Sequence, residues 1–550
     1  KENLPLVVVN EVVRAIEQSK RPVVMHGGRF DLAMGWKEGW RFEENQLIDT
    51  QIARWLLCRG VTPKGHLPMS LKTCSKRDLK APQIAIGDVM DPRGFQYTPI
   101  EKATKYAVLD GKRTLALWEW CDSRLDEFTG FRKEFFDLEM PIVRVVAHMK
   151  RHGIGFDVAW VKGAYERIVE EMKEVQAKAD AVIGGTFPMT SPAALSTMMF
   201  DELKWWVPQG ERGASGRYST AAAILLVQVD KAKPRGVKLV KLLLRWRKLE
   251  ALRSRYTLSL VGCVDSDGKI RAQFNQAGTS TGRFSSSGPN LQNIPRPTDD
   301  DDPTLASWEK NLPPIRQAFV AGAGCKLIDI DYSQIELRLV AHFSRDPVLL
   351  EAYRNGEDIH QITADSIGSS RQHAKAVNFA LIYGQSPFGL AHHIGVNQRE
   401  AEKYHRGYFR KYGAVKGWQR KVEQVAVREG YVRMITGRHR CLPALQNPKS
   451  RGHYNANVRE AINTKVQGSA ADLIKIAMRN VFNLWTEKGV IDEQVRLLSQ
   501  VHDEVIVEAE DAFVEEAAAD LKHCFENAVQ LRVPLIAEPF WGDNWLEAKG

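Results

Sequence analysis

The sequence KLIDIDYSQIELR at residues 326–338 decides how the centre of this chain folds. Its apolar residues alternate with Asp329 and Asp331, as in a half-buried β-strand, and helical spacing of apolar residues begins after Ser333. Asp331 is therefore expected where a strand passes into a helix. A carboxylate at such an edge suits Mg²⁺, which prefers oxygen ligands and keeps water and substrate phosphates in its shell. For one such residue, an N-cap or surface acid is the competing interpretation.

A second acidic segment, LLSQVHDEVIVE, lies at residues 497–508. Two apolar strand arms flank His502, Asp503 and Glu504, which predicts a hairpin that presents Asp503 and Glu504 near its tip. Two Mg²⁺ ions about 3.5–4 Å apart, bridged by such carboxylates, form the usual clamp for in-line phosphoryl displacement. An ordinary acidic turn is the alternative interpretation of this segment alone.

A third segment, RQHAKAVNFALIYG at residues 371–384, has helical spacing. Steps of four residues place Arg371, Lys375, Phe379 and Tyr383 on one slowly drifting stripe. Cations suit a triphosphate and aromatic faces suit a base, so a nucleotide lying along the stripe would satisfy both ends. The alternative is an exposed helix end followed by core aromatic residues.

Positive charge is concentrated in one further segment. The chain of 550 residues has 77 Lys+Arg against 67 Asp+Glu, a net charge of +10. Residues 231–255 hold ten basic residues and one acid, Glu250, which gives +9. Leucines recur at helical spacing there, and Lys241, Arg245 and Lys248 line another face. Either this face follows a phosphate backbone or it is an ordinary solvated helix face. The ten basic residues are Lys231, Lys233, Arg235, Lys238, Lys241, Arg245, Arg247, Lys248, Arg253 and Arg255.

Composition and the pattern of expected helices and strands indicate a protein of several domains that contains both α-helices and β-sheets. With 44% hydrophobic and 26% charged residues, the chain is not a disordered or fibrous protein. The seven scattered cysteines form no CxxC pair and are expected to be reduced, and no apolar run approaches the length of a membrane span. An α/β pattern up to about residue 125 precedes long helices at 130–260. Strand-like alternation at 270–274, 325–332 and 497–507, with helices at 346–430, completes an α/β and α+β multidomain pattern.

The three segments resemble motifs A, B and C of family A (polymerase I-like) DNA polymerases, in the same order and with suitable separations. TGRFSS at 281–286, PNLQNIP at 289–295 and QGSAAD at 467–472 match further signatures of that family. The similarity begins near residue 139 and covers most of the chain. It implies a right-hand fold preceded by a partial RNase H-like 3′–5′ exonuclease domain. The expected borders are 1–128 for the exonuclease-like part, 129–169 for the palm start, 170–260 for the thumb, 261–345 for the palm, 346–430 for the fingers and 431–550 for the palm with motif C.

The resemblance implies a template-directed DNA polymerase that adds dNTPs to a primer 3′-OH by two-metal in-line transfer and releases pyrophosphate. Asp331, Asp503 and the Tyr332 carbonyl would hold two Mg²⁺ ions, for which Mn²⁺ can substitute, with Glu504 as a supporting acid. Lys375 would protonate the departing pyrophosphate, and Glu336 would be the steric gate against a ribose 2′-OH. The residues implied to bind the incoming nucleotide are Arg371, Lys375, Phe379, Tyr383, Gln334, Glu336 and His360.

The resemblance also implies contacts with primer–template DNA. The matching positions are Arg283, Asn290, Gln292, Asn293, Arg459, Gln467 and His502, together with Lys241, Arg245 and Lys248 on the thumb helix. We expect a monomer without a membrane anchor in the cytoplasm of a bacterium or a phage-infected cell, working with replication accessory proteins. Only ten residues separate His360 from Arg371, which indicates compact fingers as in phage replicative members of the family.

The N-terminal region resembles the exonuclease domain incompletely. HGGRFD at 26–31 and YAVLD at 106–110 are similar to its second and third motifs and supply Asp31, Tyr106 and Asp110. The first motif, Asp-x-Glu, is missing, and Asn10-Glu11 is a poor substitute. We therefore expect no exonuclease activity and a chain that starts inside this domain, because Lys1 is not a Met.

Two other functions remain open from the sequence. A single-subunit RNA polymerase shares the palm and the cation–aromatic stripe, but Glu336 and Phe379 favour DNA synthesis. A catalytically inactive DNA-binding relic would keep the fold and lose the chemistry, and the presence of Asp331, Asp503 and Lys375 argues against it.

Overall fold

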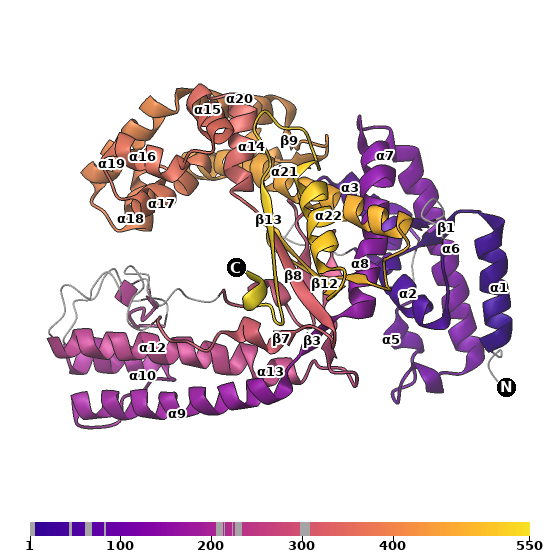
Figure 1. The fold of residues 1–550 in the computed structure, drawn as a ribbon, viewed down its shortest axis with the longest axis horizontal. Coiled ribbons are helices and arrows are strands. Elements are labelled where there is room, and N and C mark those ends of the chain that lie inside the picture. The colour runs from indigo at the N-terminus through magenta and orange to yellow at the C-terminus, as the bar shows by residue number, and fades with distance from the viewer. Residues whose placement is uncertain are drawn as a thin grey trace. The chain divides into compact units, whose positions relative to one another are not determined.

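A computed structural model describes residues 6–42, 47–60, 69–81, 84–204, 213, 215–222, 224–225, 234–296 and 309–549. The chain divides into two compact units, each assembled from segments far apart in sequence (Figure 1). The first consists of Lys1–Gly153, Ala272–Ser287 and Ile328–Phe540, and the second of Ile154–Arg271, Gly288–Leu327 and Trp541–Gly550. This division follows packing alone, so the expected borders of palm, fingers and thumb remain predictions.

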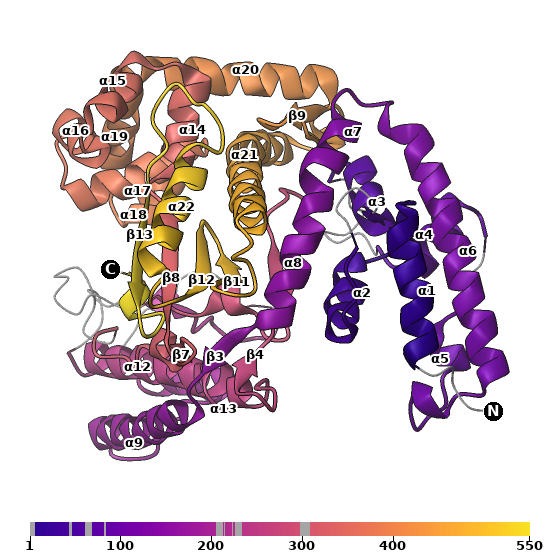
Figure 2. The same ribbon diagram turned by 45° about the vertical axis from the view of Figure 1, so that its right-hand side comes forward.

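A four-stranded sheet lies at the centre of the first unit, with strand order β11-β12-β8-β13. Its strands are β8 (Cys325–Tyr332), β11 (Val495–Val501), β12 (Glu504–Glu510) and β13 (Ala537–Gly542). Strands β11 and β12 form the predicted antiparallel hairpin, in which Val501 pairs with Glu504. Four consecutive residues of β8 are buried, which shows that both faces of the sheet are covered. Helix α8 (Met140–His152) packs on β11, and α22 (Val514–Glu526) packs on β12 (Figure 2).

The helical insertion predicted for residues 346–430 is confirmed. After α14 (Ile335–Ser344) come α15 (Pro347–Asn355), α16 (Ile359–Ile367), α17 (Arg371–Ile382), α18 (Pro387–Ile394), α19 (Gln398–Lys411) and α20 (Gly413–Glu429). Each of α15 to α19 begins with a side chain that accepts a hydrogen bond from a backbone N–H of the first turn. These caps are Asp346, Asp358, Ser370, Ser386 and Asn397.

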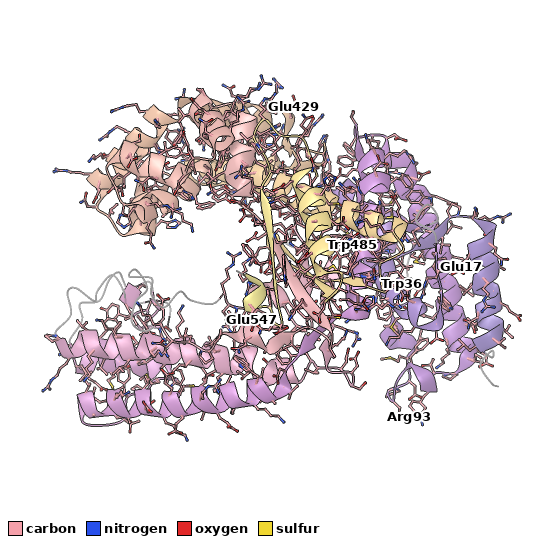
Figure 3. All side chains as sticks on the ribbon, in the orientation of Figure 1. Glu17, Trp36, Arg93, Glu429, Trp485 and Glu547 are labelled. Carbon is pink, nitrogen blue, oxygen red and sulfur yellow. The ribbon has the colours of Figure 1, made fainter. Side chains whose placement is uncertain are left out.

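The longest helix of the first unit, α21 (Arg451–Glu487), follows the short antiparallel pair β9 (Tyr431–Arg433) and β10 (His439–Cys441) and the turn η9 (Pro443–Leu445). Near its end Trp485, labelled in Figure 3, is fully buried and donates from Nε1 to Asp520 of α22 at 3.0 Å. Lys475 of the same helix is also fully buried, and its ammonium lies 2.7 Å from Glu139. A buried cation with such a partner avoids most of the cost of desolvation.

The N-terminal part of the first unit has the predicted α/β character with little sheet. Its helices are α1 (Leu6–Ser19), α2 (Gly28–Gly35), α3 (Thr50–Cys58), α4 (Leu71–Asp78), α5 (Ile86–Val89), α6 (Ile100–Leu125) and α7 (Phe131–Glu134), with the 3₁₀ helices η1 (Trp36–Glu38) and η3 (Phe95–Tyr97) and the π-helix η4 (Phe135–Glu139). Strands β1 (Val23–Met25) and β2 (Leu47–Asp49) pair in parallel. Helices α3 and α6 pack together through buried residues such as Ala53, Leu56 and Leu117.

The second unit contains the helices α9 (Val158–Ile183), α10 (Pro192–Ser196), α12 (Pro234–Tyr256) and α13 (Leu258–Val261), with α9 packed along α12. A three-stranded sheet, β4-β3-β7, is formed by β3 (Ile154–Phe156), β4 (Lys269–Ile270) and β7 (Phe319–Val320). This unit also contains the π-helix η5 (Thr197–Glu202) and the 3₁₀ helices η7 (Leu291–Asn293), η8 (Ile315–Ala318) and η10 (Glu547–Lys549).

The strand predicted at 270–274 is wrong as one element. It is split into β4 and β5 (Gln273–Asn275), and β5 pairs with β6 (Ser285–Ser287) in the first unit. All seven cysteines are free thiols, as expected. Within the described ranges, no helix combines the length and apolar character needed to span a bilayer.

Candidate active site

One predicted aspartate lies on strand β8 of the central sheet, and the other lies directly before the neighbouring strand β12. Asp331 is the penultimate residue of β8, directly before α14, as the sequence predicts. Asp503 lies in the tight turn between β11 and β12, where His502 takes a left-handed φ of 54°. Because β12 is hydrogen-bonded next to β8, the topology brings together the two strands that carry the predicted metal ligands.

Glu504 lies beside the hairpin tip, as predicted, but its side chain is not presented to solvent. It is the first residue of β12, and its side chain is fully buried, whereas the Asp503 side chain is 26% exposed. Successive residues of a strand point to opposite faces, so only one of two adjacent acids can face out of the sheet. Tyr332 is also buried, and its hydroxyl donates to the Phe525 carbonyl at 2.7 Å. The Tyr332 side chain is therefore occupied elsewhere, which leaves its backbone carbonyl as the group that could serve a metal.

Arg283 connects the two acidic segments. Its Nη2 lies 2.7 Å from Glu336 Oε1 and 3.8 Å from Asp503 Oδ1. Glu336, in the first turn of α14, also accepts a hydrogen bond from the Tyr383 hydroxyl. Burial raises the pKa of Glu336 to about 7; the Arg283 cation opposes this shift and the Asp503 carboxylate adds to it. Arg283, Glu336, Tyr383 and Asp503 thus form one connected cluster.

The cation–aromatic stripe lies on α17 as predicted. Arg371 and Lys375 are exposed, while Phe379 and Tyr383, at the other end of the helix, are partly buried. Arg371 forms an ion pair with Asp358 at 2.5 Å, between its Nε and the carboxylate. The helix therefore presents its cations to solvent, while Tyr383 contacts Glu336 and the Phe379 ring lies 6.1 Å from the His360 ring, measured between centroids.

The side chains of Gln334 and His360, two further predicted nucleotide-binding residues, each have a partner within the protein. Gln334, in a left-handed conformation with φ of 54°, accepts a hydrogen bond from the Tyr353 hydroxyl at 2.9 Å. His360 is buried against Asn378, with 2.8 Å between its Nδ1 and the Asn378 amide nitrogen. Burial lowers the pKa of His360 to about 4, so it is neutral at pH 7.

The predicted primer–template residues fall in both units. In the first unit, Arg459 and Gln467 lie two turns apart on α21 and are partly exposed, and His502 is exposed at the hairpin turn. In the second unit, Asn290 and Asn293 are exposed around η7 and Gln292 is partly exposed. Asn290 caps this turn by accepting from the Gln292 N–H at 3.1 Å.

The predicted basic face of α12 needs correction at Arg245. Its guanidinium is only 12% exposed, lies 2.6 Å from Glu171 of α9 and donates to the Lys310 carbonyl at 2.5 Å. The packing of α12 along α9 turns this position inward and neutralises its charge. Lys241 and Lys248 are exposed, although Lys248 lies 2.9 Å from Glu309. Lys231 and Lys233 fall outside the described residues.

The exonuclease-like residues lie near one acid that sequence reasoning missed. Asp49, at the end of β2, is buried and accepts from the N–H groups of Gly27 at 2.9 Å and Gly28 at 2.7 Å, and it also caps α3. An acid after an apolar strand and before a helix is the signal that could have identified it. Partial burial and the Asp49 carboxylate raise the pKa of Asp31 to about 6. The Tyr106 side chain is hydrogen-bonded to Asp110 on α6.

One other set of side chains in the described ranges is close enough to share an ion: His148, His152 and Asp492. Asp492 Oδ1 lies 3.1 Å from His148 Nδ1 and 2.6 Å from His152 Nε2. The backbone N–H of Leu497 donates to His148 Nε2 at 3.3 Å, so the proton of this imidazole lies on Nδ1, facing Asp492. A protonated Nδ1 cannot ligate a metal, and the set is therefore a hydrogen-bonded clamp between α8 and the turn before β11.

The fold and this arrangement of acids define a mixed α/β protein with a polymerase-type palm. The family model of DNA polymerase family A matches residues 159–547. The chain belongs to this family, and its fold is accordingly the family's arrangement of palm, fingers and thumb.

Named relatives agree with this assignment. DNA polymerase I of Pseudomonas aeruginosa is 34% identical over 510 residues, which cover 91% of this chain and 54% of that protein. The thermostable DNA polymerase I of Thermus caldophilus is 37% identical over 427 residues, 76% of this chain and 48% of that protein. The POL domain of Pol1 from M. smegmatis, solved in complex with DNA primer-template and dNTP, is similar with a TM-score of 0.83 and 30% identity, covering 96% of this chain and 87% of that one. The chain spans about half the length of the two polymerases. Both are bacterial, and a phage origin for this chain stays a prediction.

Proposed function

We propose that this chain is a template-directed DNA polymerase that adds dNTPs to a primer 3′-OH and releases pyrophosphate. The observation that carries the proposal is the position of Asp331 near the end of β8 and of Asp503 directly before the neighbouring strand β12, with Arg283 reaching from Asp503 to Glu336. Family membership and the likeness to a polymerase domain bound to primer-template DNA and dNTP support it.

The donor set fits two Mg²⁺ ions. Asp331, Asp503 and the Tyr332 carbonyl offer oxygen ligands, the kind that Mg²⁺ prefers, and Asp503 is partly exposed to an incoming ion. When bound, the ions would lower the pKa of the primer hydroxyl and neutralise charge on the transferred phosphate. Glu504, being buried, would act from beneath the site and touch neither substrate.

The α17 stripe would bind the incoming nucleotide along its length. Arg371 and Lys375 are exposed and so can pair with the triphosphate, for which Arg371 would exchange its contact with Asp358. Lys375, one turn closer to the aromatic residues, would give a proton to the departing pyrophosphate. Phe379 and Tyr383 would stack against the nascent base pair.

Glu336 would select the sugar. It is held from two sides, by Arg283 and by the Tyr383 hydroxyl, so it cannot swing away to admit a larger substituent. A rigid side chain at this place would exclude a ribose 2′-OH by occupying its space. This feature favours DNA synthesis over RNA synthesis.

The test is Mg²⁺-dependent extension of a labelled primer–template by the full chain. We expect extension with dNTPs by the parent protein and none by Asp503→Asn, which keeps the size of the side chain and removes its charge. Asp511→Asn is the matched control, because Asp511 is an exposed acid just beyond the far end of β12. No extension by the parent would support the inactive relic, and equal use of rNTPs would support the RNA polymerase.

A further inference from the structure

A buried arginine contacts the turn that carries Arg283. Arg438 lies between β9 and β10, and only 3% of it is exposed. Its Nη2 donates to the Thr281 carbonyl at 2.7 Å, to Asp472 Oδ1 at 2.6 Å and, more weakly, to the Gly468 carbonyl at 3.3 Å. One guanidinium therefore joins the turn before β6, helix α21 and the β9–β10 turn.

The contact with the turn at residues 281–283 is close enough to restrict its sequence. Gly282 has φ of +86°, and a Cβ placed there would lie 2.5 Å from Arg438 Nη2. A Cβ on Gly468 would lie 3.2 Å from the Thr281 carbonyl oxygen and 2.7 Å from Met434. The turn thus packs directly against the guanidinium, and no side chain would fit between them.

The guanidinium itself is held by acids. Asp472 is fully buried and also accepts from the Thr436 hydroxyl at 2.8 Å, while Glu134 lies 3.8 Å from Arg438 Nε. Burial and the Asp472 charge raise the pKa of Glu134 to about 8, and the Arg438 cation opposes this shift. The planar fork of an arginine can reach a carboxylate and a carbonyl together, which the single ammonium of lysine does less well.

We propose that Arg438 is a positioning residue of the catalytic centre, which fixes the turn from which Arg283 reaches Glu336 and Asp503. This inference rests on the proposed function, because its effect is exerted on the sugar gate and on a metal ligand. The guanidinium contacts Thr281, two residues before Arg283, and touches no substrate. Moving the turn would move the Arg283 side chain away from Glu336.

The experiment compares Arg438→Lys with the parent in single-nucleotide extension. The quantity measured is the ratio of kcat/KM for dCTP to that for CTP, which is independent of the fraction of active protein. We expect Arg438→Lys to lower this ratio about tenfold, the scale of losing one charge-assisted hydrogen bond at the gate. In an Arg283→Ala background, Arg438→Lys should change the ratio no further, because its effect passes through Arg283.

Arg440→Lys is the matched control, since Arg440 is a nearby, largely buried arginine whose partners Glu460 and Thr464 are on α21. It should keep the parent ratio. An unchanged ratio in Arg438→Lys would overturn the inference and leave Arg438 a purely structural residue. If Arg438→Lys does not fold, Gly282→Ala tests the same contact from the other side, and a parent-like ratio there would also overturn it. Failure of the parent to extend a primer would instead reject the proposed function.

Discussion

Glu336 is the residue at which the parts of the site meet. It lies in the first turn of the helix after the Asp331 strand, it contacts Arg283 from the turn before β6, and it accepts a hydrogen bond from Tyr383 at the end of α17. Burial alone would favour its protonated form, and Arg283 is what opposes this. A carboxylate held in this way keeps a fixed position and a fixed volume.

Replacement of Glu336 by alanine should weaken sugar discrimination. We expect Glu336→Ala to raise relative ribonucleotide incorporation by about 10- to 200-fold, the range for gain or loss of space for one small group. Steady-state kcat/KM for dCTP and CTP on one primer–template gives this value. Glu357→Ala, which removes an exposed acid after α15, is the control. Unchanged discrimination in Glu336→Ala would exclude this residue as the gate.

At the scale of elements, helix α12 carries two kinds of cation. Some are exposed to solvent, and others make contacts within the second unit. Arg245 pairs with Glu171, and Arg247 donates to the Thr220 carbonyl at 2.6 Å, whereas Lys241 is exposed. A cation already neutralised by an acid releases no counterion from DNA when a phosphate approaches. The DNA contribution of this helix is therefore expected from its exposed lysines.

Two substitutions on α12 should then have different effects. Lys241→Ala should reduce the salt dependence of duplex DNA binding by about 0.9 in the slope of log K against log salt and leave thermal stability unchanged. Arg245→Ala should leave the slope unchanged and destabilise the second unit by roughly 1–3 kcal/mol, because Glu171 and a carbonyl lose their donor. Fluorescence anisotropy at several salt concentrations and thermal melts measure both. An identical loss of slope in the two variants would show that the Arg245 side chain leaves Glu171 for DNA.

The hydrogen-bonded clamp of His148, His152 and Asp492, between α8 and the turn before β11, should make the free energy of unfolding depend on pH. Burial lowers the pKa of His148 from 6.5 to about 4, with the His152 imidazole, Arg151 and Asp492 facing it. Between these two values the unfolded chain binds a proton that the folded chain excludes, so the stabilisation is complete above pH 6.5 and falls as the pH approaches 4. The loss is at most about 3 kcal/mol.

This dependence can be measured with urea unfolding at pH 7.5 and pH 5.0. His148→Gln, which has no titrating group in this range, should lose less stability between the two conditions than the parent. His523→Gln is the control, because it removes a histidine that is exposed near the end of α22. If the parent and His148→Gln respond equally to pH, then His148 is not the group responsible.

Local sequence patterns predicted the elements that local interactions decide. The alternation before Asp331, the period of α17 and the apolar arms around Asp503 each specify an element without distant partners, and all three have the predicted type. The features that local patterns did not predict depend on residues far away in the sequence. The inward position of Arg245 is set by Glu171, 74 residues away. The role of Arg438 depends on Thr281, 157 residues away.

At the scale of the whole molecule, the charge is unevenly distributed. Residues 231–255 carry +9 of the net +10, so the remainder is close to neutral. Some acids in that remainder are engaged within the protein: Asp358 caps a helix, Asp472 forms a buried ion pair and Asp492 contacts two histidines. Asp49 and Asp110 in the N-terminal part also have hydrogen-bond partners within the protein. This affects whether the N-terminal part can bind the metal ions that a nuclease needs.

The chain should not trim a mismatched primer. A two-metal exonuclease needs several carboxylates free to share two ions. In the N-terminal part, Asp49 is committed to the backbone N–H groups of Gly27, Gly28 and Gln51, and Asp110 is hydrogen-bonded to Tyr106. Asp31, whose pKa is raised to about 6, is then left without a second available carboxylate to share metal ions among the described residues.

Incubation of a labelled primer bearing a 3′ mismatch with the chain and Mg²⁺, without dNTPs, should leave the length of the primer unchanged. Asp31→Asn distinguishes the sources of any shortening: trimming that persists in this variant comes from another nuclease, and trimming that it abolishes would prove the N-terminal part active.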